Sequence, residues 1–371
     1  METETLIVGA SSAGLAVARQ LQERGKSYLQ IDRAEAVGQM WRSAYDRLHL
    51  HTARSRSGLP FAPMPRSYPR YPSRQQMVDY LESYRRGLAQ QPLFSREVKN
   101  ISRQGERWRC DLAGETIFAR NVVIATGNTR VPVRPAFEGD TSFAGPILHS
   151  SEYRTGAAYR GKNVLVVGFG NSACEIAIDL CEQGAQPTLA VRGAVNAIPR
   201  ELFGIPIQHL GLIQTLFPPR IADAINAPVL RLVVGDIRKL GLRKLPYGAI
   251  EQIRVHQQQP LMDIGTLALI RSGSIAIRPG IDRFTPTGVV FTDGREEKFD
   301  AVILATGFRA ALGDLLPDAP EVLDANGTPR ISGDRTAAPG LYFCGFRLTS
   351  GGGIREAGLE AGRIADVIAA G

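Results

Sequence analysis

The stretch NVLVVGFGNSACEIAIDLCEQGA, residues 163–185, contains three features in a fixed order. A run of apolar residues is followed by a turn of small residues, and then by a segment with apolar side chains at positions i, i+3, i+4, i+7 and i+8. The first pattern is typical of a buried strand, and the last is typical of one face of a helix. This order of strand, tight turn and helix predicts the start of a Rossmann-type α/β unit.

The small residues of the turn have separate roles in such a unit. Gly168 allows the sharp turn after the strand, and Gly170 lets backbone N–H groups approach a pyrophosphate. The amino terminus of a helix favours this anion through its unpaired donors and its dipole. Ala173 lets the helix and the strand pack closely. The stretch therefore predicts a dinucleotide site.

A second copy of this design lies near the start of the chain, in TLIVGASSAGLAVARQLQERG, residues 5–25. Gly9 and Gly14 occupy the first and third small positions, but Ser11 replaces the middle glycine. A serine leaves less room for a phosphate, although its hydroxyl can donate a hydrogen bond to one. Two copies, each in the correct context, favour two nucleotide sites over a purely structural role.

The residue after the second strand of each unit predicts which nucleotide binds. Asp32 follows Gly9 by 23 residues, where a carboxylate accepts hydrogen bonds from a ribose hydroxyl. Arg192 follows Gly168 by 24 residues, where a guanidinium suits a 2′-phosphate. We therefore expect an unphosphorylated dinucleotide in the first site and NADP in the second. The alternative for Arg192 is an ordinary solvated surface arginine.

Two further strands share a sequence pattern. NVVIATGN, residues 121–128, and DAVILATGF, residues 300–308, are both apolar runs that end in Ala-Thr-Gly. The simplest topology has a first domain that is interrupted by the second. We expect an α/β fold with two Rossmann-like domains, in which the NADP domain (151–299) is inserted between the two parts of the FAD domain (1–150 and 300–371). The glycine-rich start of a last helix in SGGGIREAGLEAGRIADVI, residues 350–368, should face the first cofactor.

Composition excludes several other classes of protein. The net charge of +8 comes from 44 basic residues spread along the chain, without the clusters that nucleic-acid binding requires. The four cysteines form no CxxC pair and no metal-ligand spacing, so no metal is expected. We expect no signal peptide, because the amino terminus enters a strand at once, and no membrane partner, because no apolar run reaches about 18 residues. The expected location is the cytoplasm.

One segment is rich in proline. GLPFAPMPRSYPRYP, residues 58–72, has five prolines in fifteen residues, which is incompatible with a helix or a central strand. We expect a stiff extended loop. It is followed by a helix that should begin with a capping box between Ser73 and Gln76.

The segment between the two nucleotide motifs carries a family pattern. In FAGPILHSSEY, residues 143–153, the residues Phe143, Gly145, His149 and Tyr153 match the motif FxGxxxHxxx(Y/F). With two dinucleotide sites, the chain thus resembles the class B flavin-dependent monooxygenases. The Baeyer–Villiger branch usually ends this motif in tryptophan, so Tyr153 favours the flavin-containing monooxygenase branch.

Within that branch the chain most resembles the YUCCA flavin monooxygenases, and the resemblance extends over most of its length. The similar stretches are YDRLHLHT, YPRYPSRQQMVDYLESY, GPILHSSEYRTG, YRGKNVLVVGFGNSACEIAIDL, IPRELFG, PLMDIGTLALIRSGSIAIRPGI and FDAVILATGF. The resemblance implies that NADPH reduces FAD, that O2 adds at flavin C4a, and that the resulting (hydro)peroxide transfers one oxygen atom to a small organic substrate. In this family the linker motif couples NADP binding to flavin reduction.

The resemblance also implies the site residues. Thr52 takes the position of an asparagine that the family often carries beside the flavin, and we expect Thr52, Arg54 and His149 to take part in catalysis. Only one of His49 and His51 should face the flavin. Trp41 has the alternative of being a core aromatic residue. The expected cofactor-binding residues are Gly9, Ser11, Gly14, Asp32, Arg33, Gln39, Trp41, Thr126, Gly127, Gly168, Gly170, Asn171, Ser172, Ala173, Arg192, Thr306 and Gly307.

Several functions stay open at this point. The expected substrate is an aromatic 2-oxo acid, which the enzyme would decarboxylate oxidatively. Alternatives are oxygenation of sulfur or nitrogen, and a non-catalytic FAD/NADP redox-sensing module. A disulfide reductase is disfavoured because the chain has no CxxC pair. The assembly state is also open, with a homodimer as one option.

Overall fold

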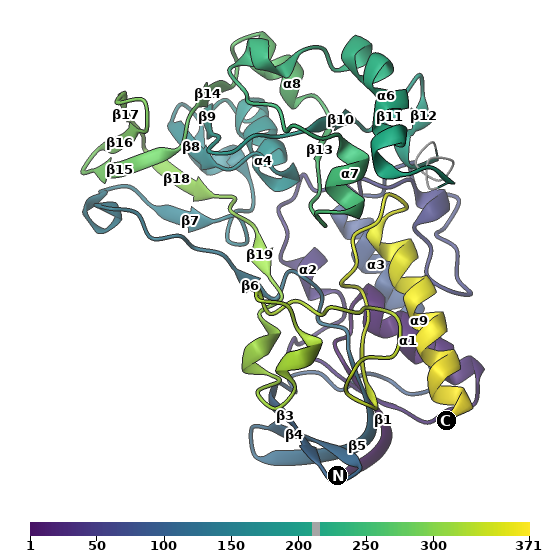
Figure 1. Ribbon diagram of the computed structural model, residues 1–371. Coiled ribbons are helices and arrows are strands. Elements are labelled where there is room, and N and C mark those ends of the chain that lie inside the picture. Colours follow the sequence, from purple (N-terminus) through teal and green to yellow (C-terminus); the bar gives the residue numbers. More distant parts are fainter. Residues whose placement is uncertain (210–215) are drawn as a thin grey trace. The chain divides into compact units, whose positions relative to one another are not determined.

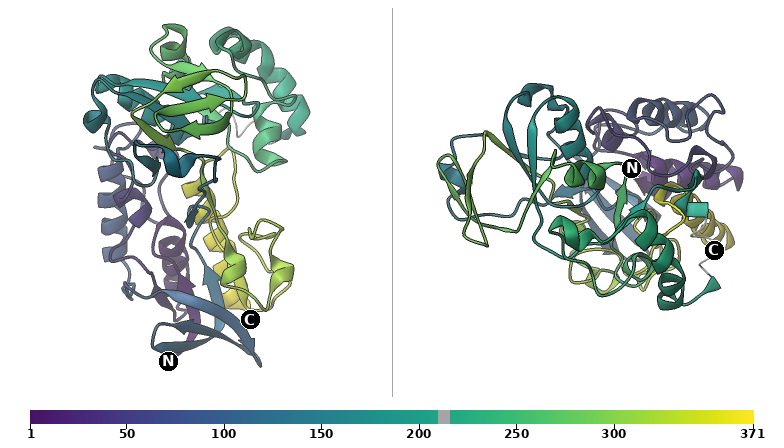
Figure 2. Two further views of the ribbon diagram at one scale, coloured as in Figure 1. Left: turned by 90° about the vertical axis from the view of Figure 1, so that its left-hand side faces the viewer. Right: turned by 90° about the horizontal axis from the view of Figure 1, so that it is seen from above.

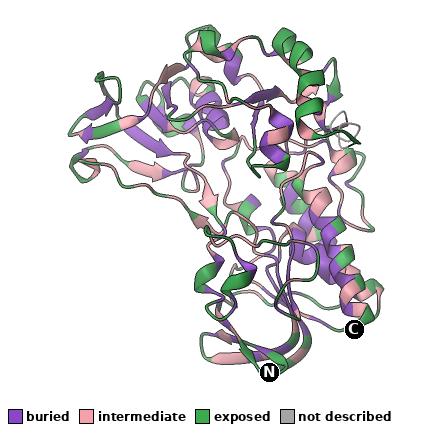
Figure 3. Ribbon diagram, viewed as in Figure 1, coloured by how far each residue is buried: buried purple, intermediate pink, exposed green. Residues whose placement is uncertain are grey.

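A computed structural model describes residues 1–209 and 216–371 of the chain (Figure 1). Contacts between residues divide the chain into two compact units. Unit 1 comprises Met1–Ser43, Thr52–Val131 and Phe308–Gly371, and unit 2 comprises Ala44–His51 and Pro132–Gly307. Each unit contains one of the two glycine-rich turns. Buried residues, which are purple in Figure 3, are concentrated in the strands and in the helices that follow the two turns.

Unit 1 is built on a six-stranded sheet in which β2-β1-β5-β4-β3 are neighbours and β20 also pairs with β5. The carboxyl-terminal half of β5 runs parallel to β1 and β20, whereas its amino-terminal half is antiparallel to β4. One strand therefore joins a parallel sheet to an antiparallel meander. The strands are β1 (Glu2–Val8), β2 (Leu29–Ile31), β3 (Val98–Gln104), β4 (Arg107–Leu112), β5 (Glu115–Ile124) and β20 (Leu341–Phe343).

Helices complete unit 1. The helix of the first motif, α1 (Ser12–Glu23), packs against β1 and against the carboxyl-terminal helix α9 (Gly353–Ala370), as Figures 1 and 2 show. The short α2 (Gln39–Arg42) packs against α3 (Arg74–Arg86). The predicted capping box at the start of α3 is confirmed: the Ser73 hydroxyl accepts from the Gln76 N–H, and the Gln76 side chain accepts from the Ser73 N–H.

Unit 2 is built on a parallel sheet in the order β14-β9-β8-β18-β7. Alternate residues of these strands point to opposite faces. One face packs against α4 (Asn171–Glu182), and the other packs against an antiparallel sheet. The parallel strands are β7 (Ile147–His149), β8 (Asn163–Val167), β9 (Gln186–Ala190), β14 (Ala276–Arg278) and β18 (Ala301–Leu304); the antiparallel strands are β15 (Ile281–Thr285), β16 (Gly288–Phe291) and β17 (Glu296–Lys298).

The remaining elements of unit 2 are short strands and helices. They are β10 (Ala197–Pro199), which pairs with β13 (Leu261–Asp263), β11 (Glu201–Leu202), which pairs with β12 (Ile205–Pro206), α6 (Pro219–Val233), α7 (Ala249–Arg254) and α8 (Thr266–Arg271). The two-residue strands β6 (Val131–Pro132) and β19 (Phe308–Arg309) lie at the two points where the chain passes between the units. Within the described residues, no helix is long and apolar enough to cross a membrane.

The boundaries of the units differ from the division at residues 150 and 299 that we expected from the sequence. The reason is the pairing of two strands. β18 lies between β8 and β7 in the second sheet, so residues 132–150 and 300–307 fold with unit 2. Residues 44–51 also belong to unit 2.

Candidate functional site

The first glycine-rich turn is packed too tightly for side chains at two positions. Gly9 has φ +119°, and a Cβ atom there would lie 2.6 Å from the carbonyl oxygen of Ala125. A Cβ atom at Gly14 would lie 1.9 Å from the carbonyl oxygen of Gly9. Both glycines are therefore required by close contact of the backbone with itself, as the sequence predicted for a turn of this kind. The turn leads directly into the amino terminus of α1.

Asp32 follows β2 and reaches back to this turn. Its Oδ2 atom accepts a hydrogen bond from the Ala10 N–H at 2.5 Å, and its Oδ1 atom accepts from the Ala34 N–H at 2.8 Å. The carboxylate is thus fixed beside the amino terminus of α1. At the middle position, Ser11 is the residue before the helix, and its side chain makes no capping hydrogen bond. The Ser11 hydroxyl is therefore available to donate a hydrogen bond to a phosphate.

The carboxyl end of β5 lies next to this turn. Thr126 follows β5, and its Oγ1 atom is buried without a hydrogen-bond partner among the described residues. The next residue, Gly127, has φ +71° and open space around the position of a Cβ atom. A buried hydroxyl without a partner is unfavourable unless a ligand or water satisfies it. The site thus fits a polar ligand.

The segment around α2 meets the turn from another side. The Gly38 N–H donates to the carbonyl oxygen of Ala10 at 3.2 Å. Gln39 is exposed at the start of α2, whereas Trp41 is buried. Arg33 is exposed, and its guanidinium donates to the carbonyl oxygen of Arg130 at 3.2 Å. Gln39 and Arg33 therefore have room to meet a ligand, and Trp41 packs as a core residue.

Thr52 lies at the amino terminus of α9. A Cβ atom at Gly352, the residue before this helix, would lie 2.8 Å from Thr52 Cγ2. The Thr52 hydroxyl is 2.6 Å from that of the fully buried Ser57. The structure thus brings Thr52 to the glycine-rich end of α9. The sequence predicted that each of these two segments lies near the first cofactor, but it did not predict their contact. Thr52 and Gly352 are 300 residues apart in the sequence.

The second glycine-rich turn has one closed position and one open position. Gly168 has φ +128°, and a Cβ atom there would lie 2.5 Å from the carbonyl oxygen of Ala305. Gly170 has φ −80°, and a Cβ atom there would meet nothing within 4 Å. The space beside Gly170, at the start of α4, is therefore free for a phosphate. Ala173 is fully buried under the turn.

Two polar residues of the second turn contact other parts of unit 2. The Asn171 side-chain oxygen accepts from the Met262 N–H at 2.8 Å, which ties the turn to β13. Ser172 hydrogen-bonds the phenol of Tyr45, and burial followed by the charge of Glu175 raises the pKa of that phenol well above its usual value. Asn171 and Ser172, which we expected to bind the cofactor, therefore each already make a hydrogen bond within unit 2.

Arg192 lies two residues beyond β9 and is exposed. Its guanidinium has no hydrogen bond or ion pair with any residue that the structure describes, while its carbonyl oxygen accepts from the Arg243 guanidinium. The short β14 runs beside β9, and a Cβ atom at Gly280, just after β14, would lie 3.2 Å from Arg192 Cγ. The end of β9 therefore presents a free cation, as NADP binding requires.

The linker motif lies entirely in unit 2. Phe143 packs edge-on against Phe284, with the ring centroids 5.7 Å apart. A Cβ atom at Gly145 would lie 2.6 Å from the carbonyl oxygen of Asp300, just before β18. The Tyr153 hydroxyl donates to Asp179 of α4 at 2.5 Å, and Asp179 also accepts from the Gly156 N–H at 2.8 Å. Asp179 is a partner that the sequence did not reveal.

His149 is the last residue of β7 and is fully buried. Its Nδ1 atom accepts from the Ser151 N–H at 3.2 Å, so Nε2 carries the proton and donates to the carbonyl oxygen of Gly307 at 3.0 Å. Burial lowers the pKa of His149, which favours this neutral form. The side chain thus holds the backbone that follows β18. The hydroxyl of Thr306 holds the same backbone by donating to the carbonyl oxygen of Val133.

The two histidines before Thr52 lie in different environments. His51 Nε2 is 2.6 Å from the buried Glu175 carboxylate of α4. His49 is exposed, and its Nδ1 atom is 2.7 Å from the carbonyl oxygen of Arg47. His51 is therefore a polar partner of α4 within unit 2.

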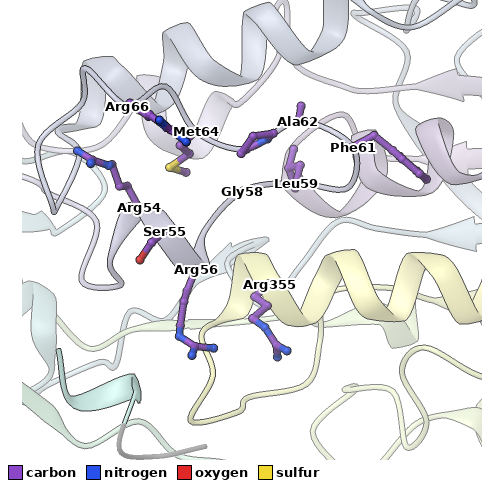
Figure 4. A pocket seen from close by; sticks show the side chains of 11 residues that line it. Arg54, Ser55, Arg56, Gly58, Leu59, Phe61, Ala62, Met64, Arg66 and Arg355 are labelled. Carbon is purple, nitrogen blue, oxygen red and sulfur yellow. The ribbon is translucent and has the colours of Figure 1, made fainter. Parts of the chain in front are cut away.

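A pocket of about 700 Å³ lies in unit 1 beside the amino-terminal turn of α9 (Figure 4). It is formed by a short 3-10 helix (Arg54–Arg56), by the start of the proline-rich loop and by Arg355 of α9. Arg54 lines it, but its guanidinium donates to the carbonyl oxygen of Tyr68. The lining residues are Arg54, Ser55, Arg56, Gly58, Leu59, Phe61, Ala62, Pro63, Met64, Arg66 and Arg355.

Comparison with known proteins identifies the family. Residues 6–201 match the pyridine nucleotide-disulphide oxidoreductase family. The chain is 38% identical to indole-3-pyruvate monooxygenase YUCCA1 of Oryza sativa subsp. japonica over 350 residues, which is 92% of this chain and 86% of the relative. It is 37% identical to indole-3-pyruvate monooxygenase YUCCA6 of Arabidopsis thaliana over 99% of this chain and 90% of the relative. The chain belongs to the YUCCA family of flavin monooxygenases.

A solved structure supports the same conclusion for this YUCCA-family protein. A variant of the flavin monooxygenase from Stenotrophomonas maltophilia superposes with a TM-score of 0.76 and 26% identity, over 100% of this chain and 98% of that one. The steroid monooxygenase bound to NADP shares the fold, with a TM-score of 0.76 and 20% identity. The YUCCA-family chain is therefore an enzyme, a flavin-dependent monooxygenase with FAD and NADPH as cofactors that acts on a small molecule with O2.

The YUCCA-family protein has residues that fit both cofactors. The first turn offers the amino terminus of α1, the fixed Asp32 carboxylate and the buried Thr126 hydroxyl, which has no partner in residues 1–209 and 216–371. The second turn offers the open space at Gly170 and the free Arg192 cation. The thiols suit a monooxygenase better than a disulfide reductase, because burial raises the pKa of Cys110 to about 12 and that of Cys181 to about 11.

Proposed function

We propose that this protein is an NADPH-dependent monooxygenase that converts an aromatic 2-oxo acid into the arylacetic acid with one carbon fewer. The similarity to the indole-3-pyruvate monooxygenases, over 86–90% of their length, carries the proposal. The reaction consumes the 2-oxo acid, O2, NADPH and a proton. It yields the arylacetate, CO2, water and NADP. One oxygen atom of O2 enters the new carboxylate and the other leaves as water.

We propose that FAD binds unit 1 and that NADPH binds unit 2. Asp32 would accept hydrogen bonds from the FAD ribose, and the amino terminus of α1 would bind the FAD pyrophosphate. Gly170 and the amino terminus of α4 would bind the NADPH pyrophosphate, and Arg192 would bind its 2′-phosphate. When bound, the flavin supplies the redox chemistry that passes electrons from NADPH to O2. The protein supplies binding, orientation and exclusion of water.

The three predicted catalytic residues differ in their proposed roles. Thr52 adjoins the amino terminus of α9, and its hydroxyl is bound to that of Ser57. We propose that this pair of hydroxyls lies beside the flavin and orients it. Arg54 would shape the loop pocket, since its guanidinium binds the backbone at Tyr68. His149 is neutral and bound to Gly307, so we propose a positioning role for it: it would fix the backbone between β18 and the return of the chain to unit 1.

A substrate panel tests the proposed function. Purified protein with FAD is mixed with NADPH and with indole-3-pyruvate, phenylpyruvate, a thioether or a tertiary amine. NADPH oxidation, hydrogen peroxide and products are measured together. The proposal requires arylacetate and CO2 in amounts that match the NADPH consumed. Sulfoxide or N-oxide without turnover of 2-oxo acids would instead show a sulfur- or nitrogen-oxygenating enzyme. FAD and NADP binding without any substrate-dependent NADPH oxidation would indicate a redox sensor.

A further inference from the structure

The pocket beside α9 has an unusual balance of charge. Among the residues that the structure describes, four arginines line it and no aspartate or glutamate does. The guanidinium groups of Arg56, Arg66 and Arg355 have no ion pair within residues 1–209 and 216–371, and Arg56 Nε is buried without a hydrogen-bond partner there. Neighbouring like charges repel one another, and a buried donor without a partner is costly. An anion in this pocket would remove both penalties.

Two of these arginines come from opposite ends of the chain. Figure 4 shows the side chains of Arg56 and Arg355 extending in the same direction, one from a short 3-10 helix (Arg54–Arg56) and one from the first turn of α9. Guanidinium groups donate in a planar fork that matches the two oxygens of a carboxylate. The pair therefore suits a carboxylate that lies at the helix amino terminus, where the helix dipole also favours an anion.

Most of the remaining lining is apolar. It consists of Leu59, Phe61, Ala62, Pro63 and Met64, together with Ser55 and Gly58. Phe61 has φ +64°, a backbone conformation that is uncommon for a bulky residue, and its side chain is 60% exposed. Strain of this kind persists only where the surroundings impose it, and it is often associated with binding sites. A pocket with one cationic end and an apolar wall suits an organic acid with a hydrocarbon or aromatic group.

Helix α3 holds the apolar loop in place. The Tyr80 hydroxyl accepts from the Leu59 N–H and donates to the carbonyl oxygen of Ala62, both at 2.6 Å. The Tyr84 hydroxyl donates to the carbonyl oxygen of Pro60 at 2.9 Å. Three backbone groups of the loop are thus bound to a rigid helix. The pocket is therefore pre-formed, which reduces the entropy lost when a ligand binds.

We propose that this pocket is the substrate-acid site: Arg56 and Arg355 bind the carboxylate of the 2-oxo acid, and Leu59, Phe61 and Met64 contact its aromatic group. This inference rests on the proposed function, because it assigns the acid substrate to a site. The alternative anion is a phosphate of FAD. The first glycine-rich turn already provides a place for that phosphate, so the substrate carboxylate is the better match.

Binding of phenylpyruvate tests the site without requiring turnover. Arg56→Ala, Arg355→Ala and the double variant are purified with FAD, and the dissociation constant for phenylpyruvate is measured by calorimetry without NADPH. Each single change should weaken binding by about 10-fold or more, because a charge-assisted hydrogen bond is lost. Arg86→Ala is the control, since Arg86 is exposed in the last turn of α3 and lies outside the pocket. It should leave the constant unchanged.

An uncharged ligand shows whether a variant has lost only its binding of the carboxylate or has also lost the shape of the pocket. Benzyl methyl ketone resembles phenylpyruvate but lacks the carboxylate. It should bind weakly, and its dissociation constant should be nearly the same for the parent and for the variants. Flavin content, read from absorbance, should stay at the level of the parent. Unchanged phenylpyruvate binding in the double variant would overturn the proposal. Loss of flavin from Arg56→Ala and Arg355→Ala would also overturn it, because the anion would then be a cofactor phosphate.

The same measurements distinguish failure of the site from failure of the proposed function. If phenylpyruvate binds through the two arginines but is not converted, the proposed site is supported and the proposed reaction is refuted. Phenylpyruvate that is converted with an unchanged Michaelis constant in the double variant would leave the reaction standing and refute the site.

Discussion

Replacement of Gly170 by alanine separates cofactor binding from folding more cleanly than any other change in the second turn. The residue has φ −80° and ψ 178°, which alanine adopts without strain. Beyond its immediate chain neighbours, the added Cβ atom would meet no atom of the described residues within 4 Å. The methyl group would nevertheless occupy the space at the amino terminus of α4 where the NADPH pyrophosphate is expected. We therefore expect a well-folded variant with weakened NADPH binding.

The expected change in stability follows from two small effects of opposite sign. Replacing glycine lowers the entropy of the unfolded chain, which stabilises by about 0.4–1 kcal/mol. Alanine is a poorer residue than glycine before a helix, which costs a similar amount. The melting temperature should therefore change by no more than about 3 °C. Gly168→Ala is the matched comparison, because its Cβ atom would lie 2.5 Å from Ala305 O at φ +128°. Strain and overpacking there should cost roughly 2–6 kcal/mol.

The expected effect on binding is much larger than the effect on stability. Displacing the pyrophosphate weakens at least one charge-assisted hydrogen bond, worth about 1.5–3 kcal/mol, or roughly 10- to 150-fold in affinity. NADH and NADPH share this group, so the Michaelis constants for both should rise together in Gly170→Ala. Thermal unfolding and steady-state kinetics provide the two readouts. A stable Gly170→Ala protein with the parent's Michaelis constant for NADPH would show that no phosphate lies at this position.

Other changes address the remaining assignments. Arg192→Ala should raise the Michaelis constant for NADPH by about 10-fold or more but leave that for NADH nearly unchanged; equal loss with both nucleotides would make Arg192 structural. Asp32→Lys should yield colourless protein, because a cation replaces the ribose acceptor, and absorbance at flavin wavelengths checks this. His149→Ala removes the donor to Gly307 and should divert NADPH consumption to hydrogen peroxide, so unchanged coupling would argue against a positioning role. The thiols should react slowly with a thiol reagent at pH 8 in the native protein and quickly after unfolding, because the pKa of Cys110 is raised to about 12 by burial and thiolate is scarce at that pH; rapid reaction of native protein would contradict this.

The two Rossmann-type starts could be predicted from the sequence because each is a local pattern. A strand, a turn and a helix lie within about 25 residues, and the period of the apolar residues changes at the turn. The structure places both turns as expected, with Gly9 and Gly168 against the backbone of the neighbouring strands. The capping box of α3 is equally local and was predicted correctly.

Strand partners could not be predicted in the same way, because pairing is not a local property. The two Ala-Thr-Gly strands have the same pattern, yet β5 pairs in the first sheet and β18 pairs in the second. Their sequences give no sign of the difference. The arginines of the pocket could not be predicted for a similar reason, since Arg56 and Arg355 come to line one pocket only after α9 has packed in unit 1.

The linker motif is a local pattern in the sequence, but its structural role depends on contacts with residues that are far away in the sequence. Phe143 and Tyr153 anchor the two ends of the linker in unit 2, on opposite faces of its parallel sheet. Between them, β7 pairs with β18 so that His149 lies opposite Leu304. This register carries the imidazole to Gly307, the last residue before the chain returns to unit 1. Because only the neutral ring with its proton on Nε2 satisfies both the Ser151 N–H and the Gly307 carbonyl, protonation in acid would break the hydrogen bond from the Ser151 N–H. Because burial lowers the pKa of His149, this hydrogen bond persists to a lower pH than it would with an ordinary histidine. The motif therefore keeps the backbone after β18 in one position at neutral pH.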